Sequence, residues 1–318
     1  MPESGMLTQD KPLRVKRTLW ISRLLRDWRA DLGIGIILFF IILALLSPVL
    51  APGNPNYFVD EGNLPPSAKH ILGTMSLGQE GYAQLIWGAR MSLGIGFTTG
   101  LVITFLSVAI GMITGYARGL LSDVLSVLTN VFLVIPGLCL AIVMAAYLPS
   151  GPLSIIVVLS ISGWPWGARV LRAQTLSLRE KDFVAAALVS GESHLHIIFF
   201  DILPNMISLV VANVIGSTMY AIGAEVGLEF LGLGNISSVS WGSILYWARA
   251  TSALPRGAWW QFLPAGLCVA LIGFALALTN FALDEVSNPR LRKEMGSKHG
   301  LRFAAGPGQP TPVVRSIQ

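Results

Sequence analysis

Apolar residues in this chain gather into six long runs, and the segments between them carry most of the polar and charged residues. A helix needs roughly 20 apolar residues to cross the hydrocarbon core of a bilayer. The pattern therefore predicts an all-α membrane protein with six transmembrane helices. The predicted spans are Leu32–Ala51, Met91–Tyr116, Val124–Leu148, Leu153–Trp166 (extending to about Leu171), Met206–Val226 and Phe262–Leu283.

The composition agrees with this interpretation. Hydrophobic residues make up 53% and charged residues 12% of the 318 positions, and the mean hydropathy is +0.66. A soluble domain carries about 25% charged residues. Both cysteines, Cys139 and Cys268, lie in apolar runs and are expected to be small core residues. The net charge of +5 does not predict a nucleic-acid partner, because the basic residues flank the spans.

The distribution of Lys and Arg predicts the orientation in the membrane. Eighteen of the 22 basic residues lie in the two tails, the turn after the second span and the loop after the fourth; four lie on the other side. Cytoplasmic segments of membrane proteins are enriched in Lys and Arg. Both termini and the loop near 167–205 are therefore predicted to be cytoplasmic, and the segments near 52–90 and 229–261 to be external.

Two cytoplasmic tails flank the predicted transmembrane domain, residues 32–290. Within the tail 1–31, residues 19–28 place Leu, Ile and Trp mostly at spacings of three and four, with Arg side chains off that face. This pattern favours an interfacial helix on the cytoplasmic leaflet; a helix packed against the bundle is the alternative. The tail 291–318 is polar and rich in Gly and Pro, and is predicted to be disordered.

Glycine pairs and prolines inside the spans suggest how the helices meet. Glycines four residues apart let helix backbones approach closely in lipid. We expect packing within the chain, with a subunit interface as the alternative, for Gly96/Gly100, Gly111/Gly115 and Gly223/Gly227. Pro136 and Pro165 should each kink a span, and such a kink serves either as a gate beside a pathway or simply in packing.

Two acidic residues near the outer end of the fifth span attract attention. Glu225 and Glu229 are four residues apart and share one helical face if the helix continues through them. A carboxylate in lipid is costly, so both should face water or protein. We expect them to line the external mouth of a translocation pathway; the alternative is that the helix has ended and Glu229 lies in an external loop.

The cytoplasmic segment 182–205 carries signals for two short helices. Asp182 can cap the first, and Gly191 can end it in a left-handed turn. Ser193 can start the second, which Pro204 is expected to stop. Two short helices on a cytoplasmic loop would form a knob for docking another protein.

Several motifs along the chain resemble one family. Over residues 32–290 the chain resembles the C-type permease of the oligopeptide, dipeptide and nickel importers driven by ATP-binding-cassette (ABC) ATPases. The matching motifs are Ala186-Ala-x(3)-Gly191-x(11)-Leu203-Pro204, Glu225-x(4)-Phe230-Leu-Gly-Leu-Gly234 with Trp241-Gly242, His70-Ile-Leu-Gly-Thr with Leu77-Gly78, Trp87-Gly-Ala-Arg90-Met-Ser-Leu93, and Ala168-Arg169 with Arg172.

The resemblance implies a type I ABC importer permease fold and a non-enzymatic subunit in a bacterial or archaeal cell membrane. It implies three kinds of partner besides lipid: a homologous permease, two ABC ATPases that bind ATP and Mg²⁺ in trans, and an extracytoplasmic solute-binding protein. The implied substrate is a peptide, with oligosaccharide and nickel as alternatives. The implied ATPase-coupling residues are Asp182, Ala185, Ala186, Ala187, Gly191, Leu203 and Pro204.

The chain departs from the family pattern at a few positions. Ala185 stands where the coupling loop usually has Glu, so that contact with the ATPase is altered. Met75, Gln79 and Glu80 replace an Asp, an Arg and an Asp in the external segment, and Glu229 replaces a small residue. We expect this external segment to meet an unusual binding protein or substrate.

Motifs for bound nucleotide, metal or catalysis are lacking in the sequence. There is no Gly-x(4)-Gly-Lys-Ser/Thr loop and no His-Glu-x-x-His. His194 and His196 diverge on a helix and are poor metal ligands, so we predict no cofactor or metal in this chain. The rival classes are a stand-alone secondary transporter, which would show paired repeats or mid-membrane acids, and a non-transporting scaffold, which the coupling motif disfavours.

Overall fold

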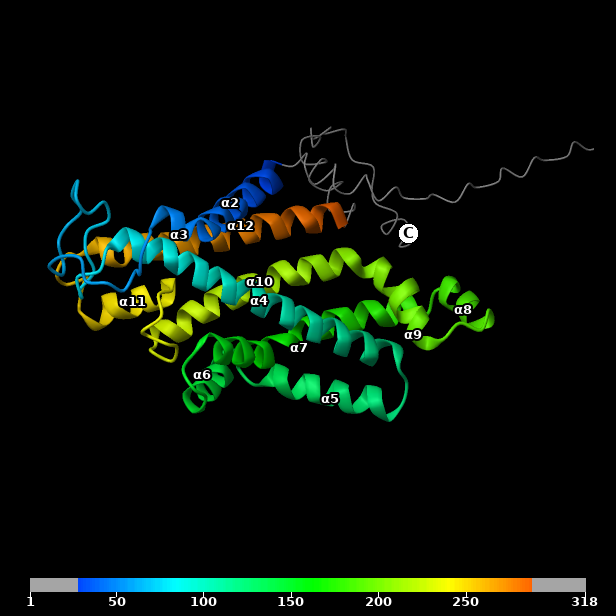
Figure 1. The fold of residues 1–318 in the computed structure, drawn as a ribbon. Coiled ribbons are helices and arrows are strands. Elements are labelled where there is room, and N and C mark those ends of the chain that lie inside the picture. The colour runs from blue at the N-terminus through cyan, green and yellow to red at the C-terminus, as the bar shows by residue number, and fades with distance from the viewer. Residues whose placement is uncertain (1–27, 288–318) are drawn as a thin grey trace, which may run out of the picture.

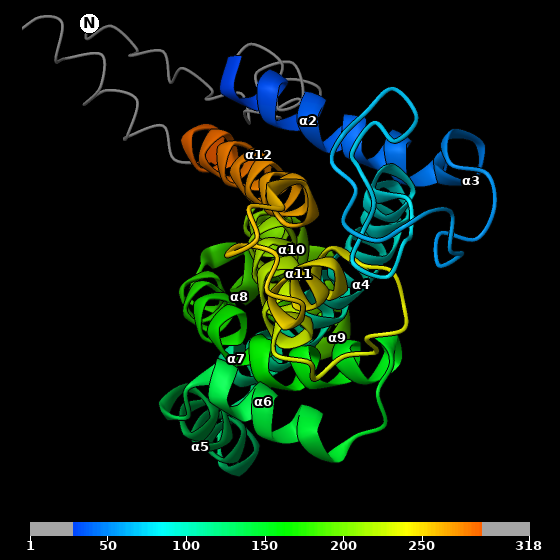
Figure 2. The same cartoon turned by 90° about the vertical axis from the view of Figure 1, so that its left-hand side faces the viewer.

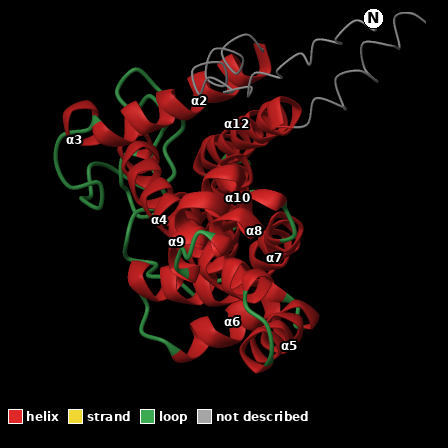
Figure 3. Ribbon diagram, turned by 90° about the vertical axis from the view of Figure 1, so that its right-hand side faces the viewer, coloured by secondary structure: helices red, strands yellow, loops and turns green. Residues whose placement is uncertain are grey.

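The computed structural model describes residues 28–287, and this part of the chain is helical, with no strand (Figures 1 and 3). The interfacial helix predicted over 19–28, apart from its last residue, and the tail 291–318 lie outside the described residues. Both stay predictions.

Five helices are long and apolar enough to cross a membrane, and a sixth crossing exists if a bent pair is counted as one span. The five are α2 (Trp28–Leu45), α4 (Gly81–Tyr116), α7 (Pro152–Arg179), α10 (Ile207–Phe230) and α12 (Leu263–Ser287). The bent pair is α5 (Leu120–Val134) and α6 (Gly137–Tyr147). The short elements are α3 (Ser47–Leu50), α8 (Asp182–Val189), α9 (His194–His196), a π-helix η1 (Ile197–Ile202), the 3₁₀ turns η2 (Leu203–Met206) and η3 (Trp259–Gln261), and α11 (Trp241–Ala250).

The two prolines inside spans behave differently. At Pro136 the expected kink is a full break, because α5 and α6 meet at 89°. The single helix predicted over 124–148 is therefore two helices. At Pro165 the helix α7 continues without interruption to Arg179. The loss of a backbone hydrogen bond at a proline thus accompanies the end of α5, whereas α7 continues as a helix through the same kind of loss.

The helices form three groups across the bundle. The helices α4, α7 and α10 pack against one another in the middle, α2 and α12 lie together on one side, and α5 and α6 lie on the other (Figures 1 and 2). The loop 51–80 and α11 occupy one end of the bundle, and α8 the opposite end. The chain therefore presents two distinct ends joined by α4 and α10.

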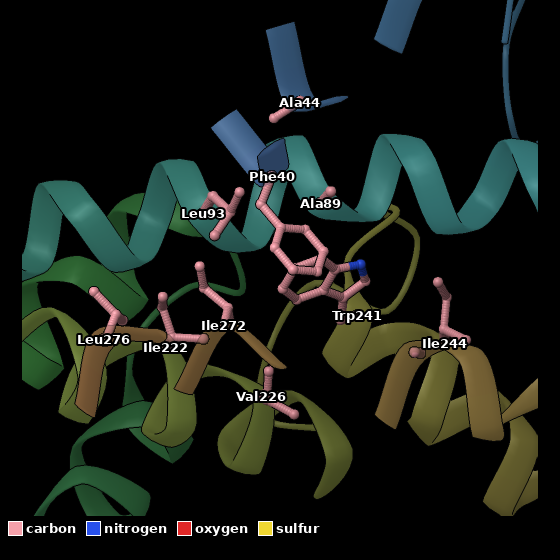
Figure 4. Packing of buried hydrophobic residues seen from close by; sticks show 11 residues of the cluster. Phe40, Ala44, Ala89, Leu93, Ile222, Val226, Trp241, Ile244, Ile272 and Leu276 are labelled. Carbon is pink, nitrogen blue, oxygen red and sulfur yellow. The ribbon is translucent and has the colours of Figure 1, made fainter. Parts of the chain in front are cut away.

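One apolar cluster ties the first helices to the last ones (Figure 4). Phe40 of α2 meets Trp241 of α11 edge to face, with ring centroids 5.6 Å apart. Leu93, Ile222 and Leu276 add side chains from α4, α10 and α12. Each is at most 3% exposed, so this cluster fixes α11 against the membrane helices.

The glycine pairs of α4 hold it close to two partners. A Cβ on Gly96 would lie 2.2 Å from a carbon of Ile222, so this pair faces α10. A Cβ on Gly111 would lie 2.7 Å from the carbonyl oxygen of Ala168, so the second pair faces α7. The prediction of packing within the chain is confirmed for both pairs. The pair Gly223/Gly227 has no atom within 4 Å of either added Cβ and faces an open surface of the chain instead.

Helix α10 resolves the two alternatives for Glu229. The helix runs to Phe230, so Glu225 and Glu229 are both helical and the loop alternative is wrong. At the same end, α4 begins at Gly81, ten residues before the predicted start of that span. Part of the segment near 52–90 that was predicted to be external is therefore helix.

Candidate functional site

The segment 182–206, here called the coupling segment, joins α7 to α10 at one end of the bundle (Figure 1). Lys181 occupies the N-cap position of α8, and no side chain caps the helix. The capping role predicted for Asp182 is therefore wrong. Asp182 is the first helical residue, where the helix dipole favours a carboxylate.

The end of α8 is the left-handed turn that the sequence predicts. Gly191 has φ +82°. Its N–H donates to the Leu188 carbonyl at 3.1 Å, and the Glu192 N–H donates to the Ala187 carbonyl at 3.1 Å. These two bonds form a Schellman motif, which satisfies carbonyls that the helix end would leave unpaired. A residue with a side chain would adopt this φ only under strain.

Beyond this turn the chain enters α10 through irregular helix. Ser193 caps α9 as expected, since its side chain accepts a bond from the His196 N–H at 3.3 Å. The stop predicted at Pro204 is wrong: the π-helix Ile197–Ile202 changes to the 3₁₀ turn Leu203–Met206 and continues into α10. The missing N–H of Pro204 falls where the hydrogen-bond ladder changes type, so it does not end the helical path.

A single buried side chain anchors α8 to the bundle. Val184 is 1% exposed and belongs to a cluster with Leu171, Ile197 and Met206. Ala185 and Ala186 are exposed and Ala187 is half-buried. The exposed large apolar side chains of this segment are Phe183, Leu188, Val189, Leu195, Phe199 and Phe200. Such a concentration of open apolar side chains, Val189 being 90% exposed, is typical of a surface that a partner covers.

Glu225 and Glu229 lie inside the chain, between α10, α4 and α11. Both are buried, at 0% and 2% exposed. Ser92 Oγ donates to Glu225 Oε1 at 3.2 Å, and Ser240 Oγ donates to Glu229 Oε2. Glu225 Oε2 has no partner among the described residues. Neither carboxylate reaches an open surface of the chain in this conformation, so the pathway role predicted for them stays a prediction.

Two glycines of the family motif make room for Glu229. A Cβ on Gly234 would lie 2.5 Å from Glu229 Cγ, and one on Gly242 would lie 2.6 Å from Glu229 Cβ. The Phe-Leu-Gly-Leu-Gly and Trp-Gly motifs therefore fold over this acid. The sequence contains the signal, but the contact joins residues whose proximity depends on how α11 folds back.

A hollow of about 500 Å³ opens between α5, α6, α7 and α10, and Asn280 of α12 also lines it. Polar neutral groups in its wall include Ser162, Asn213 and Tyr220, with the Ser162 and Tyr220 hydroxyls 3.3 Å apart. No Asp, Glu, Lys or Arg lines it. Sequence reasoning missed this hollow, although Ile135 and Gly137 beside the break at Pro136, and Pro165 itself, are part of its wall.

The two histidines of the coupling segment do not come together. The His194 ring lies 2.8 Å from the Tyr116 hydroxyl, whereas His196 pairs with Glu192 and stacks on Phe200. Asp201 brings a carboxylate oxygen within 4.8 Å of the ligand atoms of His196 and Glu192. Both histidines are exposed, which agrees with surface residues.

These features define a class of protein: a multi-pass helical membrane protein with an uncharged hollow among its spans and a segment rich in exposed apolar side chains at one end. Comparison gives the family. Residues 107–293 match the family described as binding-protein-dependent transport system inner membrane component. Residues 18–66 match the N-terminal TM domain of oligopeptide transport permease C. The chain belongs to the first of these families and is a multi-pass inner-membrane permease.

Curated relatives and solved structures agree with this assignment. A putative peptide transport system permease protein of Brucella abortus is 33% identical over 278 residues, which are 87% of this chain and 93% of the relative. The dipeptide transport system permease protein of Bacillus subtilis is 30% identical over 276 residues, 85% of each chain. The inward-facing MetNI methionine ABC transporter matches 64% of this chain and 97% of its own with a TM-score of 0.51 and 18% identity, which shows the shared fold.

Proposed function

We propose that this chain forms half of a translocation pathway for peptides and that a homologous permease forms the other half. The hollow of about 500 Å³ carries the proposal, because it opens among the spans and no residue lining it bears a formal charge. Conduction requires binding that is favourable enough for entry and weak enough for release. A neutral polar wall meets this requirement for peptides whose side chains differ in charge.

The names of the relatives support the peptide as cargo, since two of them are named as peptide and dipeptide permeases. Trp166 and Tyr220 provide aromatic surface, and Ser162 and Asn213 provide hydrogen-bonding groups for a peptide backbone. Such a wall recognises what all peptides share.

The energy comes from partners in this proposal. Two ABC ATPases bind ATP and Mg²⁺, and one of them docks on the coupling segment of this chain. The chain itself therefore has no catalytic role. The open apolar side chains around α8 support docking. The proposed coupling residues are Asp182, Ala185, Ala186, Ala187, Gly191, Leu203 and Pro204. Small exposed side chains at Ala185 and Ala186 allow close approach to a groove of the ATPase.

The proposed orientation places both termini and the coupling segment in the cytoplasm and the 51–80 loop outside, where a solute-binding protein delivers the cargo. Glu225 and Glu229 then lie near the external mouth, behind the wall of the pathway. Their bonds to Ser92 and Ser240 connect α10 with α4 and with the N-cap of α11. The pair acts there by holding α11 in place.

The test of the cargo is uptake by cells that lack this chain and by the same cells with the gene restored. We expect labelled di- and oligopeptides to accumulate only in the restored cells, whereas uptake of an oligosaccharide and of Ni²⁺ is the same in both. Restored uptake of the sugar or of nickel alone would contradict a peptide pathway.

The orientation is tested by labelling single cysteines in intact cells after Cys139 and Cys268 are replaced by Ser. Val189→Cys places a thiol in the coupling segment, and Leu254→Cys places one beyond α11; both positions are exposed, at 90% and 71%. An impermeant maleimide should label the cysteine at 254 and spare the one at 189 until the cells are opened. The reverse pattern would overturn the orientation.

A further inference from the structure

A second cluster of ionisable groups lies in the 51–80 loop, apart from the hollow and from the coupling segment. The His70 side chain is 4% exposed. Its Nδ1 lies 2.5 Å from Glu80 Oε2, and its Nε2 lies 3.3 Å from Asp60 Oδ2. Because both ring nitrogens face carboxylate oxygens, only the imidazolium, which has two N–H donors, can donate to both at once.

The two carboxylates belong to different parts of the chain. Glu80 is the N-cap residue of α4, the long helix that crosses the whole bundle. Asp60 lies within the 51–80 loop, twenty residues before Glu80, and also pairs with Lys69. Asp60, Lys69 and Glu80 are the charged groups of the described residues that act on the ring. The imidazolium therefore connects the part of the loop around Asp60 to the start of α4.

Neutral hydrogen bonds hold residues 59–64 of the loop against residues 74–78 independently of any proton. The Val59 N–H donates to the Gly78 carbonyl at 2.9 Å, and the Asn63 N–H donates to the Met75 carbonyl at 3.2 Å. Thr74 is fully buried; its hydroxyl donates to the Glu61 carbonyl at 2.7 Å and accepts from the Leu64 N–H at 2.9 Å. Its carbonyl accepts bonds from the side chains of Trp260 at 3.2 Å and Gln261 at 3.4 Å. Loss of charge on His70 should therefore loosen the turn around 65–72, which carries the ring, without releasing the rest of the loop.

We propose that His70 is a positioning residue whose imidazolium clasps the 51–80 loop to α4, so that the loop, and delivery of cargo at this face, respond to external pH. This inference rests on the proposed function and orientation. At low external pH the clasp is closed. At high pH the neutral ring keeps one donor, one of the two carboxylates loses its bond, and the turn around 65–72 becomes mobile.

The electrostatics give the direction of the response. The hydrogen bond that His70 donates to the Glu80 carboxylate raises the pKa of His70 above its usual 6.5; burial opposes this rise, and the bond to Asp60 adds to it. A raised pKa means that the stabilisation is complete below pH 6.5 and is lost as the pH rises through the higher value. The hydrogen bond from Lys69 is the largest cause that lowers the pKa of Asp60 to about 2. Asp60 therefore stays charged throughout this window.

The first test is a spin label on Ile71, which neighbours the ring and is 67% exposed. The complete importer is reconstituted with Cys139 and Cys268 replaced by Ser, and label mobility is recorded from pH 5 to pH 10. A label at Leu254, which is 71% exposed, is the matched control. We expect the Ile71 label to gain mobility with a one-proton midpoint above 6.5, and the Leu254 label to stay constant.

Two variants assign the transition to the clasp. His70→Gln should remove the midpoint, because the amide does not titrate. Glu80→Gln should move the midpoint downward, because it removes the carboxylate that contributes most to the raised pKa of His70. This variant also provides the test if His70→Gln does not assemble. A flat profile in the wild type, or the same midpoint in all three proteins, would overturn the proposal.

Peptide uptake driven by the binding protein supplies the functional readout. We expect the initial rate of the wild type to fall at least twofold across the same midpoint and the rate of His70→Gln to lack that transition. Identical pH profiles of uptake would overturn the link to delivery. A spin-label transition in an importer that carries no peptide would instead contradict the proposed cargo and leave the clasp intact, so the two failures are distinguishable.

Discussion

The two ends of this bundle differ in how their side chains pack and form hydrogen bonds within the chain. At the end formed by the 51–80 loop and α11, buried polar groups such as Thr74 and Gln261 bond to one another within the chain. At the end formed by the coupling segment, Val184 is the buried anchor of α8, and large apolar side chains around it are open. The loop end also exposes apolar side chains, such as Phe58 and Leu254, so the two ends differ in their internal bonding: a network of buried polar bonds at the first and a single buried anchor of α8 at the second.

The irregular start of α10 belongs to the same contrast. Regular helix from Ile207 to Phe230 packs on α4 and α12, whereas the π and 3₁₀ turns before it lie in the open segment. A π-helix is rare and is often found at functional sites. The coupling segment therefore combines a helix α8 that is held by one buried side chain with an unusual backbone before α10, where Ile197, Ile202 and Met206 are buried in the bundle.

The largest effect should come from Gly191→Val. Forcing a side chain into the left-handed region costs about 1–2 kcal/mol, and more for a β-branched residue, which corresponds to roughly a tenfold change in an equilibrium. We expect at least a tenfold loss of ATPase subunits that copurify with the permease, while the permease still inserts into the membrane.

Gly257→Val is the matched control for that substitution. Gly257 also has a positive φ, +70°, and nothing within 4 Å of an added Cβ, but it lies in the loop after α11. It should retain the ATPases. Equal loss in both variants would mean that backbone strain in general, rather than the coupling segment, controls assembly.

A smaller effect is expected for Gly242→Ala at the opposite end. The new methyl group would lie 2.6 Å from Glu229 Cβ and 3.1 Å from the backbone of Val226, so a closely packed contact must open. Overpacking of this kind costs about 1–3 kcal/mol. The midpoint of thermal unfolding of the purified permease should fall by several degrees, whereas Gly227→Ala on α10, with open space around it, should leave the midpoint unchanged.

The smallest effect is expected when Glu225 and Glu229 are both replaced by Gln. The amide oxygen still accepts the hydroxyl bonds from Ser92 and Ser240, so assembly and ATP hydrolysis should persist. Because both acids lie behind the wall, uptake of cationic and neutral peptides should change by the same factor, less than about threefold. A selective loss of cationic peptides would instead show that the pair lines the pathway.

The sequence predicts much of this architecture because hydropathy and bilayer thickness define the spans. The start of α4 is missed because the turns from Gly81 to Arg90 extend past the apolar run and carry polar residues such as Gln84. Pro136 and Pro165 look alike in the sequence, yet only the first breaks its helix.

The candidate site divides in the same way. The Schellman turn at Gly191 is local and was predictable from one glycine after an apolar helix. The burial of Glu229 depends on Gly234, Ser240 and Gly242 folding back over α10, and the hollow depends on five helices meeting. Local signals therefore predict the turn at the end of α8, and only tertiary structure shows the burial of Glu229 and the hollow.

The most direct test of the central claim is to fill the hollow. Gly216 of α10 lines the hollow, and no atom lies within 4 Å of a Cβ added to it. In Gly216→Phe the Cβ would therefore meet no clash, and the ring would project into the hollow. Gly35 of α2 has the same open surroundings away from the hollow, which makes Gly35→Phe the matched control. Peptide uptake is measured in proteoliposomes that contain the complete importer, together with the amount of bound ATPase. We predict that Gly216→Phe abolishes uptake while the ATPases remain bound and that Gly35→Phe transports like the wild type; wild-type uptake by the Gly216→Phe importer would contradict the pathway proposed here.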